Sequence, residues 1–338
     1  MGVPIIYDKP FLTYDELLTH LQDDYGLKIV TPSMDKKALS TLSYYDLVNG
    51  YQECMMQNGK FKPGISFSHL YHLHLIDKDF QNIILSCSLI AENAFKNKLA
   101  YALAKNYGVD MADYLHKTNY KPAHKKDIVF SRVVREIHNG LGVWRNNNFI
   151  YTQQPTKHYV ENHNHVPPWI LLKNMSFGNA INLYVLLKET VKEEVTNEII
   201  TANMPVKNKI SIITSALNLI RKYRNVVAHN LKFITFRQNK YKLPYNTVVN
   251  MINDNTIVGG CGSFNDIYGC LLAIYLITND TTLNSRTTAI ISDWYDFAEN
   301  DDEGVRNFLK SLYDEYHSIT GIPTDLKDRL KKLSSIVF

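Results

Sequence analysis

Residues 217–237, LNLIRKYRNVVAHNLKFITFR, form the stretch on which the interpretation of the whole chain depends. Apolar side chains recur in it at helical spacing: Leu217, Ile220, Tyr223, Val227 and Leu231. This spacing predicts an amphipathic helix that buries one side. Asn225 and His229 lie four residues apart, so the helix carries them one turn apart on another face, with Arg224 next to Asn225.

Arg224, Asn225 and His229 are therefore the candidate catalytic residues. A guanidinium binds two phosphoryl oxygens at once, and an imidazole with an ordinary pKa near ~6.5 transfers protons at neutral pH. The amide of Asn225 could orient the imidazole or a phosphate. This combination predicts phosphodiester chemistry on RNA.

The composition is that of a folded, globular chain. The 338 residues are 45% hydrophobic and 21% charged, which is enough to bury a substantial core. The formal net charge of +4 neither requires nor excludes a nucleic-acid partner. The four cysteines include no C-x-x-C pair, so we expect reduced thiols in a cytosolic protein.

No feature of the sequence predicts a membrane segment or a metal site. The opening residues, MGVPIIYDKP, lack the basic start and apolar run of a signal peptide, and the longest apolar run, 270–277, is far below the ~20 residues of a membrane span. The histidines at 69, 72, 74, 158, 163 and 165 have no carboxylate or thiol at ligand spacing. We therefore expect a cytoplasmic protein without metal, cofactor or membrane contact.

Helical periodicity dominates the chain, and residues 67–107 are its longest helical segment. On it, Glu92 precedes Lys96 by four residues, which by spacing alone indicates a surface ion pair. Residues 233–245 alternate enough to permit a short hairpin. Trp169 and Phe177 are expected in the core. Further helices are predicted at 9–24, 35–51, 128–138, 207–230, 263–278, 288–299, 304–318 and 325–332. The last of them would be a solvated basic helix end, with an RNA contact as the alternative.

Residues 109–166 differ from the rest, because they are rich in Asn, His, Lys and Tyr and have no sustained period. We predict loops with one or two short helices, as an irregular insertion. Its basic and aromatic residues would supply phosphate contacts and stacking planes for RNA, with simple solvation as the alternative. The candidate RNA-binding residues are Lys121, Lys125, Lys126, Arg132, Arg135 and Arg145, with Lys117 beside them and Tyr114, Tyr120, Trp144 and Tyr151 between them.

Resemblances to two known protein families add to this interpretation of the sequence. The R-N-x-x-x-H of Arg224 to His229 resembles the signature of HEPN ribonucleases. The stretches KPFLTYDELLTHL, LSTLSYYDLVNGYQ and PPWILLKNMSFGNAINLYVLL resemble the Abi-like abortive-infection proteins, in particular their AbiD/AbiF branch. The likeness covers about 8–107 and 157–280. The chain departs from it at Asp46 and Gln81, where arginine is usual, and at Lys173, where many relatives have glutamate.

The resemblance implies an all-α fold: a HEPN-like helical bundle at 61–238, interrupted by the insertion at about 109–166. An N-terminal helical extension, 1–60, and a C-terminal helical region, 239–338, would complete it. The family carries a glutamate followed four residues later by Lys or Arg, on a helix packed against the motif helix. This implies supporting roles for Glu92 and Lys96, with Glu92 able to hydrogen-bond Arg224.

The implied function is bacterial antiphage defence by abortive infection, through a metal-independent endoribonuclease that leaves 2′,3′-cyclic phosphate ends. RNA itself supplies the nucleophile, its 2′-hydroxyl. HEPN enzymes commonly pair two motifs across a dimer, so a homodimer is expected. A bound noncoding RNA would restrain or guide the nuclease, much as an antitoxin restrains a toxin. The alternatives are a non-catalytic RNA-binding protein and a HEPN module that binds a partner protein.

Overall fold

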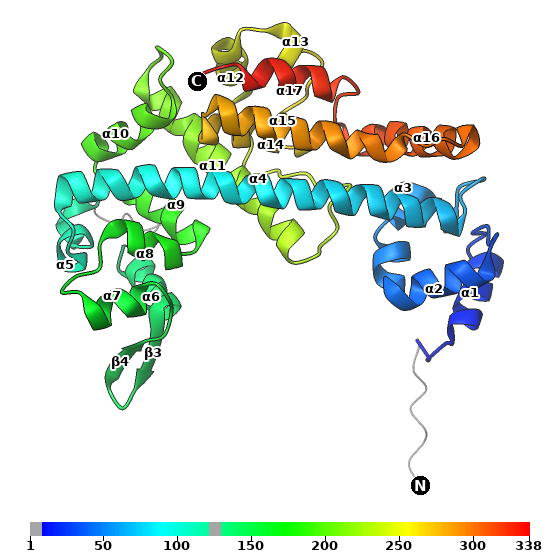
Figure 1. Cartoon of the computed structure of the whole chain (residues 1–338), viewed down its shortest axis with the longest axis horizontal. Coiled ribbons are helices and arrows are strands. Elements are labelled where there is room, and N and C mark those ends of the chain that lie inside the picture. The colour runs from blue at the N-terminus through cyan, green and yellow to red at the C-terminus, as the bar shows by residue number, and fades with distance from the viewer. Residues whose placement is uncertain (1–8, 122–129) are drawn as a thin grey trace. The chain divides into compact units, whose positions relative to one another are not determined.

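The computed structural model describes residues 9–121 and 130–338, which are mostly helical (Figure 1). The all-α prediction is confirmed, since the strands of the described residues form only two short hairpins. The chain divides into two compact units, each assembled from separate segments. Unit 1 comprises Met1–Gln81, Lys232–Phe236 and Tyr295–Thr320, and unit 2 comprises Asn82–Leu231, Arg237–Trp294 and Gly321–Phe338. No helix of the described residues has both the length and the hydropathy to cross a membrane.

Unit 1 begins as predicted and then departs from prediction. The first helix has a capping box in which Thr13 and Glu16 satisfy each other's backbone N–H groups. The helix predicted at 35–51 is broken instead, because Ser43 has a left-handed φ of 35° that no α-helix continues through. The elements are α1 (Tyr14–Asp23), α2 (Pro32–Thr41), the π-helical turn η1 (Tyr45–Asn49), α3 (Gln52–Met55), β1 (Met56–Gln57), β2 (Lys60–Phe61), the first part of α4 (Phe67–Tyr107), the 3₁₀ turn η3 (Asp296–Ala298) and α16 (Glu303–Thr320).

Unit 2 is built around one helix that is buried along its whole length, α14 (Ile267–Thr278). Asp266 caps its start and Asn279 ends it in the left-handed region. Helices α10 (Glu189–Ile199) and α11 (Val206–Ala228) pack against it. The remaining elements are the rest of α4, α5 (Met111–Tyr114), η2 (Lys117–Asn119), α6 (Phe130–Leu141), β3 (Gly142–Arg145), β4 (Asn148–Tyr151), α7 (Thr156–Asn162), α8 (Pro168–Asn174), α9 (Phe177–Leu186), α12 (Tyr245–Ile252), α13 (Asn255–Val258), α15 (Thr281–Tyr295) and α17 (Leu326–Ser334).

The insertion is more regular than predicted. The helix expected at 128–138 is found as α6, and the antiparallel hairpin β3–β4 follows it directly. Asn146 and Asn147 both have positive φ, which is the backbone of the two-residue turn that suits a hairpin's twist. The hairpin predicted at 233–245 is wrong: no strand forms there, and α12 begins at Tyr245.

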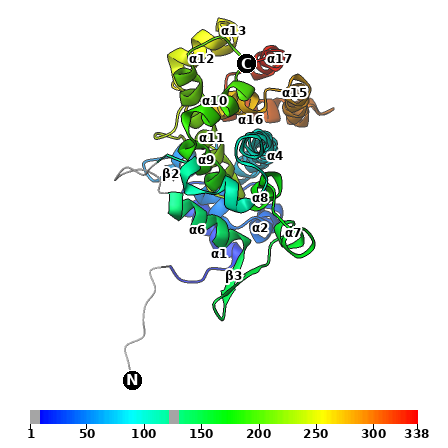
Figure 2. The ribbon, with the colours of Figure 1, turned by 90° about the vertical axis from the view of Figure 1, so that its left-hand side faces the viewer.

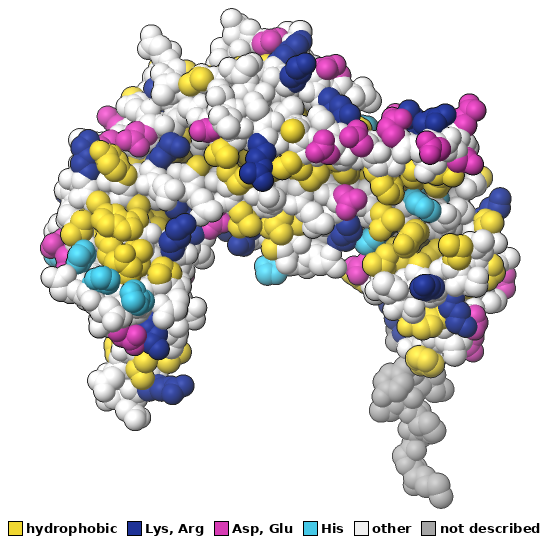
Figure 3. Space-filling view, in the orientation of Figure 1, with side chains coloured by type: hydrophobic (Ala, Val, Ile, Leu, Met, Phe, Trp, Pro, Cys, Tyr) yellow, Lys and Arg dark blue, Asp and Glu magenta, His cyan; other side chains and the backbone are white. Residues whose placement is uncertain are grey.

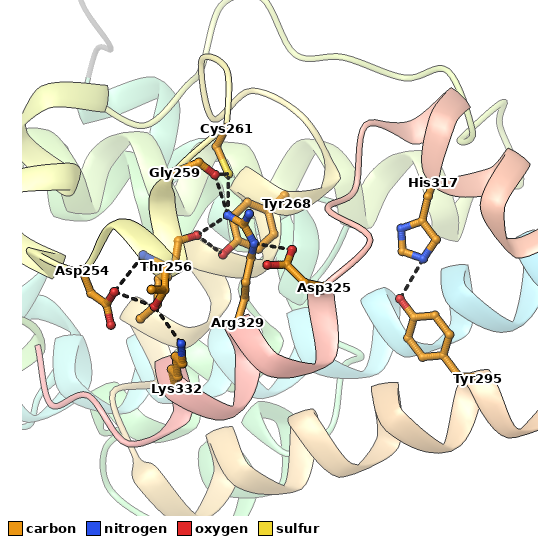
Figure 4. Close-up of polar contacts among 11 residues, drawn as sticks. Asp254, Thr256, Gly259, Cys261, Tyr268, Tyr295, His317, Asp325, Arg329 and Lys332 are labelled. Carbon is orange, nitrogen blue, oxygen red and sulfur yellow. Dashed lines mark hydrogen bonds and ion pairs between the residues drawn. The ribbon is translucent and has the colours of Figure 1, made fainter.

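The C-terminal helix α17 is attached through Arg329 rather than being a solvated basic end (Figure 4). The Nη1 atom of Arg329 donates to the carbonyl oxygens of Ile257 and Gly259, both at 2.8 Å, at the end of α13. Its Nε atom donates to Asp325 at 2.6 Å. The guanidinium therefore satisfies carbonyls that the end of a short helix leaves open, so it is not available to RNA.

Candidate functional site

Helix α11 carries the motif residues to its C-terminal end. It contacts α9, α10 and α14, and its buried side chains include Leu217, Ile220 and Tyr223, as the periodicity predicted. In Figure 2 it lies between α9 and α10. The Tyr223 hydroxyl donates to the carbonyl of Asn265, just before α14, at 3.1 Å. The end of α11 is thus held by packing and by a hydrogen bond.

The helix predicted at 207–230 ends slightly earlier, and this changes the place of the imidazole. Ala228 is the last helical residue, and His229 caps the helix with its N–H donating to the Asn225 carbonyl at 3.1 Å. Asn230 then turns the chain with a φ of 52°. Leu231, expected on the buried stripe, is 55% exposed because it lies beyond this turn.

Arg224 and Asn225 are half-buried, and His229 is exposed. The Arg224 Nη1 donates to Asn225 Oδ1 at 3.2 Å, whereas its buried Nε has no hydrogen-bond partner. No hydrogen bond of the His229 imidazole is found among the described residues. A half-buried guanidinium and an exposed imidazole therefore lie at one helix end, and both could bind a phosphodiester.

Glu92 and Lys96 form a buried ion pair on α4, not the surface pair that spacing alone indicated. The Lys96 Nζ lies 2.6 Å from Glu92 Oε1, and their side chains are 9% and 10% exposed, respectively. Lys96 also donates to the Met175 carbonyl at 2.6 Å, next to the start of α9. This contact joins α4 to α9, on which α11 packs.

The hydrogen bond that Glu92 could make to Arg224 is not formed. The second carboxylate oxygen of Glu92, Oε2, is buried without a hydrogen-bond partner, as is Arg224 Nε. Lys96 of this pair therefore contacts Met175, between α8 and α9, and neither residue of the pair contacts Arg224 through a hydrogen bond. That this pair holds Arg224 in place stays a prediction, and the observed contacts do not support it.

A second arginine, Arg221, was missed by the sequence reasoning. It lies one turn before Arg224 and Asn225, so the three share a face of α11. Its Nη2 donates to Asn218 at 3.2 Å, while its buried Nε has no partner. A Cβ on Gly178 of α9 would lie 3.6 Å from Arg221 Cδ, so the glycine leaves room for the arginine. The i, i+3 spacing of the two arginines was the signal available in the sequence.

The candidate RNA-binding residues have different surroundings. Lys121 forms an ion pair with Glu189, so its charge already has a partner. Arg132 is exposed on α6 but forms an ion pair with Glu136 at 3.9 Å. Arg135 is exposed on α6, and Arg145 is exposed at the end of β3. Lys125 and Lys126 lie outside the described residues.

The aromatic residues of the insertion also differ in their exposure to solvent. Tyr114 and Tyr120 are buried and donate to backbone carbonyls, at 2.7 Å each, so they cannot stack on bases. Trp144 on the hairpin is 65% exposed. Outside the insertion, Phe177 is in the core as predicted, but the same prediction was wrong for Trp169, which is 47% exposed on α8.

Within 9–121 and 130–338, no three His, Cys, Asp or Glu side chains are grouped as a metal site requires.

Comparison with known proteins gives one match. A model of the family described as Abi-like protein matches residues 37–235, which include α11 and its motif. No curated protein and no solved structure shows significant similarity to the chain.

Proposed function

The chain belongs to the Abi-like protein family, and from this premise we propose that it serves antiphage defence by abortive infection, as a metal-independent HEPN-type endoribonuclease of the AbiD/AbiF branch. The observation that carries the proposal is the end of α11. There His229 is exposed and Arg224 is half-buried, so an imidazole and a guanidinium lie at the same helix end.

The reaction uses a nucleophile that RNA itself provides. The 2′-oxygen attacks the adjacent phosphorus, the bond from phosphorus to the 5′-oxygen breaks, and the products are a 2′,3′-cyclic phosphate and a 5′-hydroxyl. His229 accepts the proton of the 2′-hydroxyl or donates a proton to the leaving 5′-oxygen. Arg224 stabilises the charge that builds up on the phosphoryl oxygens, and Arg221 adds a second cation on the same helix face.

One imidazole cannot both accept and donate a proton in the same step. We therefore propose a two-fold homodimer in which two copies of the α11 motif face one scissile phosphate. Such an enzyme needs restraint when no phage is present, and a bound noncoding RNA would provide it. Co-purified RNA would raise the ratio of absorbance at 260 nm to that at 280 nm, and ribonuclease treatment would remove the excess.

A second function is favoured by a specific observation. Arg224 does not donate the expected hydrogen bond to Glu92, and Glu92 pairs with Lys96 instead. An arginine that no carboxylate holds in place would bind RNA without being positioned for catalysis. The alternative is therefore a non-catalytic module that binds RNA, or a partner protein, through the same helix end.

Cleavage of end-labelled RNA by the purified protein separates these functions. His229→Ala should lower the cleavage rate by about 10²–10⁴-fold, because it removes the proton-transfer group. Arg224→Ala should lower it by about 10²–10³-fold, as expected for one donor to the developing charge. His116→Ala, which removes an exposed imidazole from another loop of unit 2, is the matched control and should leave the rate unchanged.

Two results would contradict the nuclease. One is cleavage that survives in the double variant Arg224→Ala, His229→Ala. The other is cleavage that EDTA abolishes, because the proposed reaction needs no metal. Retained RNA binding without any cleavage, in a preparation freed of bound RNA, would favour the non-catalytic alternative.

A further inference from the structure

We infer that α6 and the β3–β4 hairpin form a docking surface for unpaired RNA, on elements other than the helix α11 that carries the motif. This inference rests on the proposed function, because it takes RNA to be the partner. It adds the form of RNA recognised, the residues that recognise it and a place on the fold separate from the site of cleavage.

Aromatic rings form a continuous row on one face of the hairpin. Strand pairing sets Trp144 opposite Phe149, and their ring centroids are 5.4 Å apart. Tyr151 lies two residues after Phe149, on the same face, with its ring 4.9 Å from that of Phe149. The His138 ring of α6 lies 5.8 Å from the Phe149 ring. The row therefore extends from the end of the helix along the hairpin.

The outermost and largest ring of the row, Trp144, is accessible, whereas His138, Phe149 and Tyr151 are half-buried. Trp144 is 65% exposed, although a tryptophan side chain is usually well buried. On the opposite face, Val143 and Ile150 are 42% and 43% exposed, so the hairpin is not covered by the core on either side. Partial burial lowers the pKa of His138, which keeps its ring neutral at pH 7 and leaves it to act as an aromatic group.

The positive charge around the row favours a negatively charged partner. Residues 130–151 contain three arginines, Arg132, Arg135 and Arg145, and one acidic residue, Glu136. Arg135 precedes His138 by three residues and so lies on the same face of α6 as the row. Arg145 follows Trp144 at the tip of the hairpin. Figure 3 shows hydrophobic and basic side chains together over this part of unit 2.

Rings beside arginines are suited to unpaired nucleotides. Each base can stack on a ring while the neighbouring phosphates bind the guanidinium groups. In a duplex the bases stack on one another and are not open to these side chains. Arg132 forms an ion pair with Glu136. A protein partner would cover the apolar side chains but leave Arg135 and Arg145 without acidic groups, unless it carried them.

Binding can be tested by fluorescence anisotropy with a labelled, unstructured oligoadenylate, in the His229→Ala protein freed of bound RNA so that the probe is not cleaved. Trp144→Ala should raise the Kd by about 5- to 100-fold, the range for loss of one stacked base. Arg145→Ala should weaken binding and reduce the slope of log Kd against log salt by about one phosphate contact. A fully paired RNA of the same length should bind more weakly than the single strand.

Two variants are matched controls. Trp169→Ala removes a tryptophan of comparable exposure on α8, and Arg286→Ala removes an exposed arginine on α15. Both should leave the Kd of the probe unchanged. The inference is overturned if Trp144→Ala binds like the parent protein, if Trp169→Ala weakens binding as much, or if the duplex binds as tightly as the single strand.

The nuclease and the docking surface can be disproved independently of each other. With Trp144 intact and His229 restored, cleavage of a dinucleotide tests the nuclease by itself, because so short a substrate engages the motif alone. If no RNA is cleaved but Trp144→Ala still weakens binding, the docking surface is supported and the nuclease is overturned. If cleavage requires His229 but the Kd is unaffected by Trp144→Ala and Arg145→Ala, the nuclease stands and the docking surface is wrong.

Discussion

Asp77 is a carboxylate enclosed in the core of unit 1. Its oxygens accept hydrogen bonds from Gln81 at 2.7 Å, Tyr316 at 3.0 Å and Tyr51 at 3.2 Å. Burial nevertheless raises the pKa of Asp77 to about 6, because these neutral donors do not replace the lost hydration of the charge. Gln81 is a neutral donor, and the positive charge of Lys78 offsets the burial only in part.

The neighbouring His74 has the opposite dependence on pH. Burial lowers its pKa to about 4, so the folded state holds fewer protons than the unfolded state between about pH 4 and 6.5. Its contribution to stability therefore rises with pH in that window. The pKa of Asp77 is raised instead, so its contribution falls as the pH rises from about 4 to 6. The two effects oppose each other in the native protein.

Asp77→Asn should leave only the effect of His74. We expect the free energy of unfolding of this variant to increase more steeply with pH than that of the parent, by about 2–3 kcal/mol over the interval from pH 4 to 6. Urea titrations at several pH values in this interval measure it. Parallel curves for parent and variant would contradict the raised pKa. His74→Gln is the complementary control, and its stability should increase less with pH than that of the parent.

At the scale of the element, α14 depends on a glycine near its start. A Cβ on Gly269 would lie 2.5 Å from the carbonyl carbon and oxygen of Phe264, which are backbone atoms and cannot rotate away. The whole helix is buried, so any shift is transmitted to α11, which packs on it. This close approach, rather than conformational freedom, is the reason for glycine at this position.

Gly269→Ala should therefore lower the free energy of unfolding by about 1–3 kcal/mol, as overpacked cores do. Gly262→Ala is the matched control, since a Cβ there would have no neighbour within 4 Å. It should change stability by less than about 1 kcal/mol. Urea unfolding of both variants decides the matter, and equal losses would show that the contact with Phe264 is not the cause.

At the scale of the whole molecule, the proposed reaction needs two copies of the chain, because each supplies one imidazole. Mixing the wild-type protein with an excess of His229→Ala, after exchange of subunits, should then lower the activity per wild-type chain by at least 10-fold. The excess places most wild-type chains in mixed dimers, which lack one proton-transfer group. The mixtures are assayed with labelled RNA.

An equal excess of Arg286→Ala is the control for this mixing experiment. It alters an exposed side chain of α15 and should leave the activity per wild-type chain unchanged. Activity that simply follows the amount of wild-type protein, in spite of confirmed subunit exchange, would mean that each chain acts alone.

The sequence by itself determined the helical class, the longest helix and the position of the motif helix, because apolar periodicity and capping residues act between neighbours in the chain. It predicted α4 at its observed bounds and α11 to within two residues at either end. It also brought Arg224, Asn225 and His229 together, since their spacing is local.

Only the tertiary structure decided which side chains these residues meet. It paired Glu92 with Lys96 and Met175 rather than with Arg224, and it placed Arg221 beside Gly178. It buried Tyr114 and Tyr120 while leaving Trp144 in solvent. Burial and partner choice depend on packing between segments far apart in the chain, and local patterns of residues do not encode that packing.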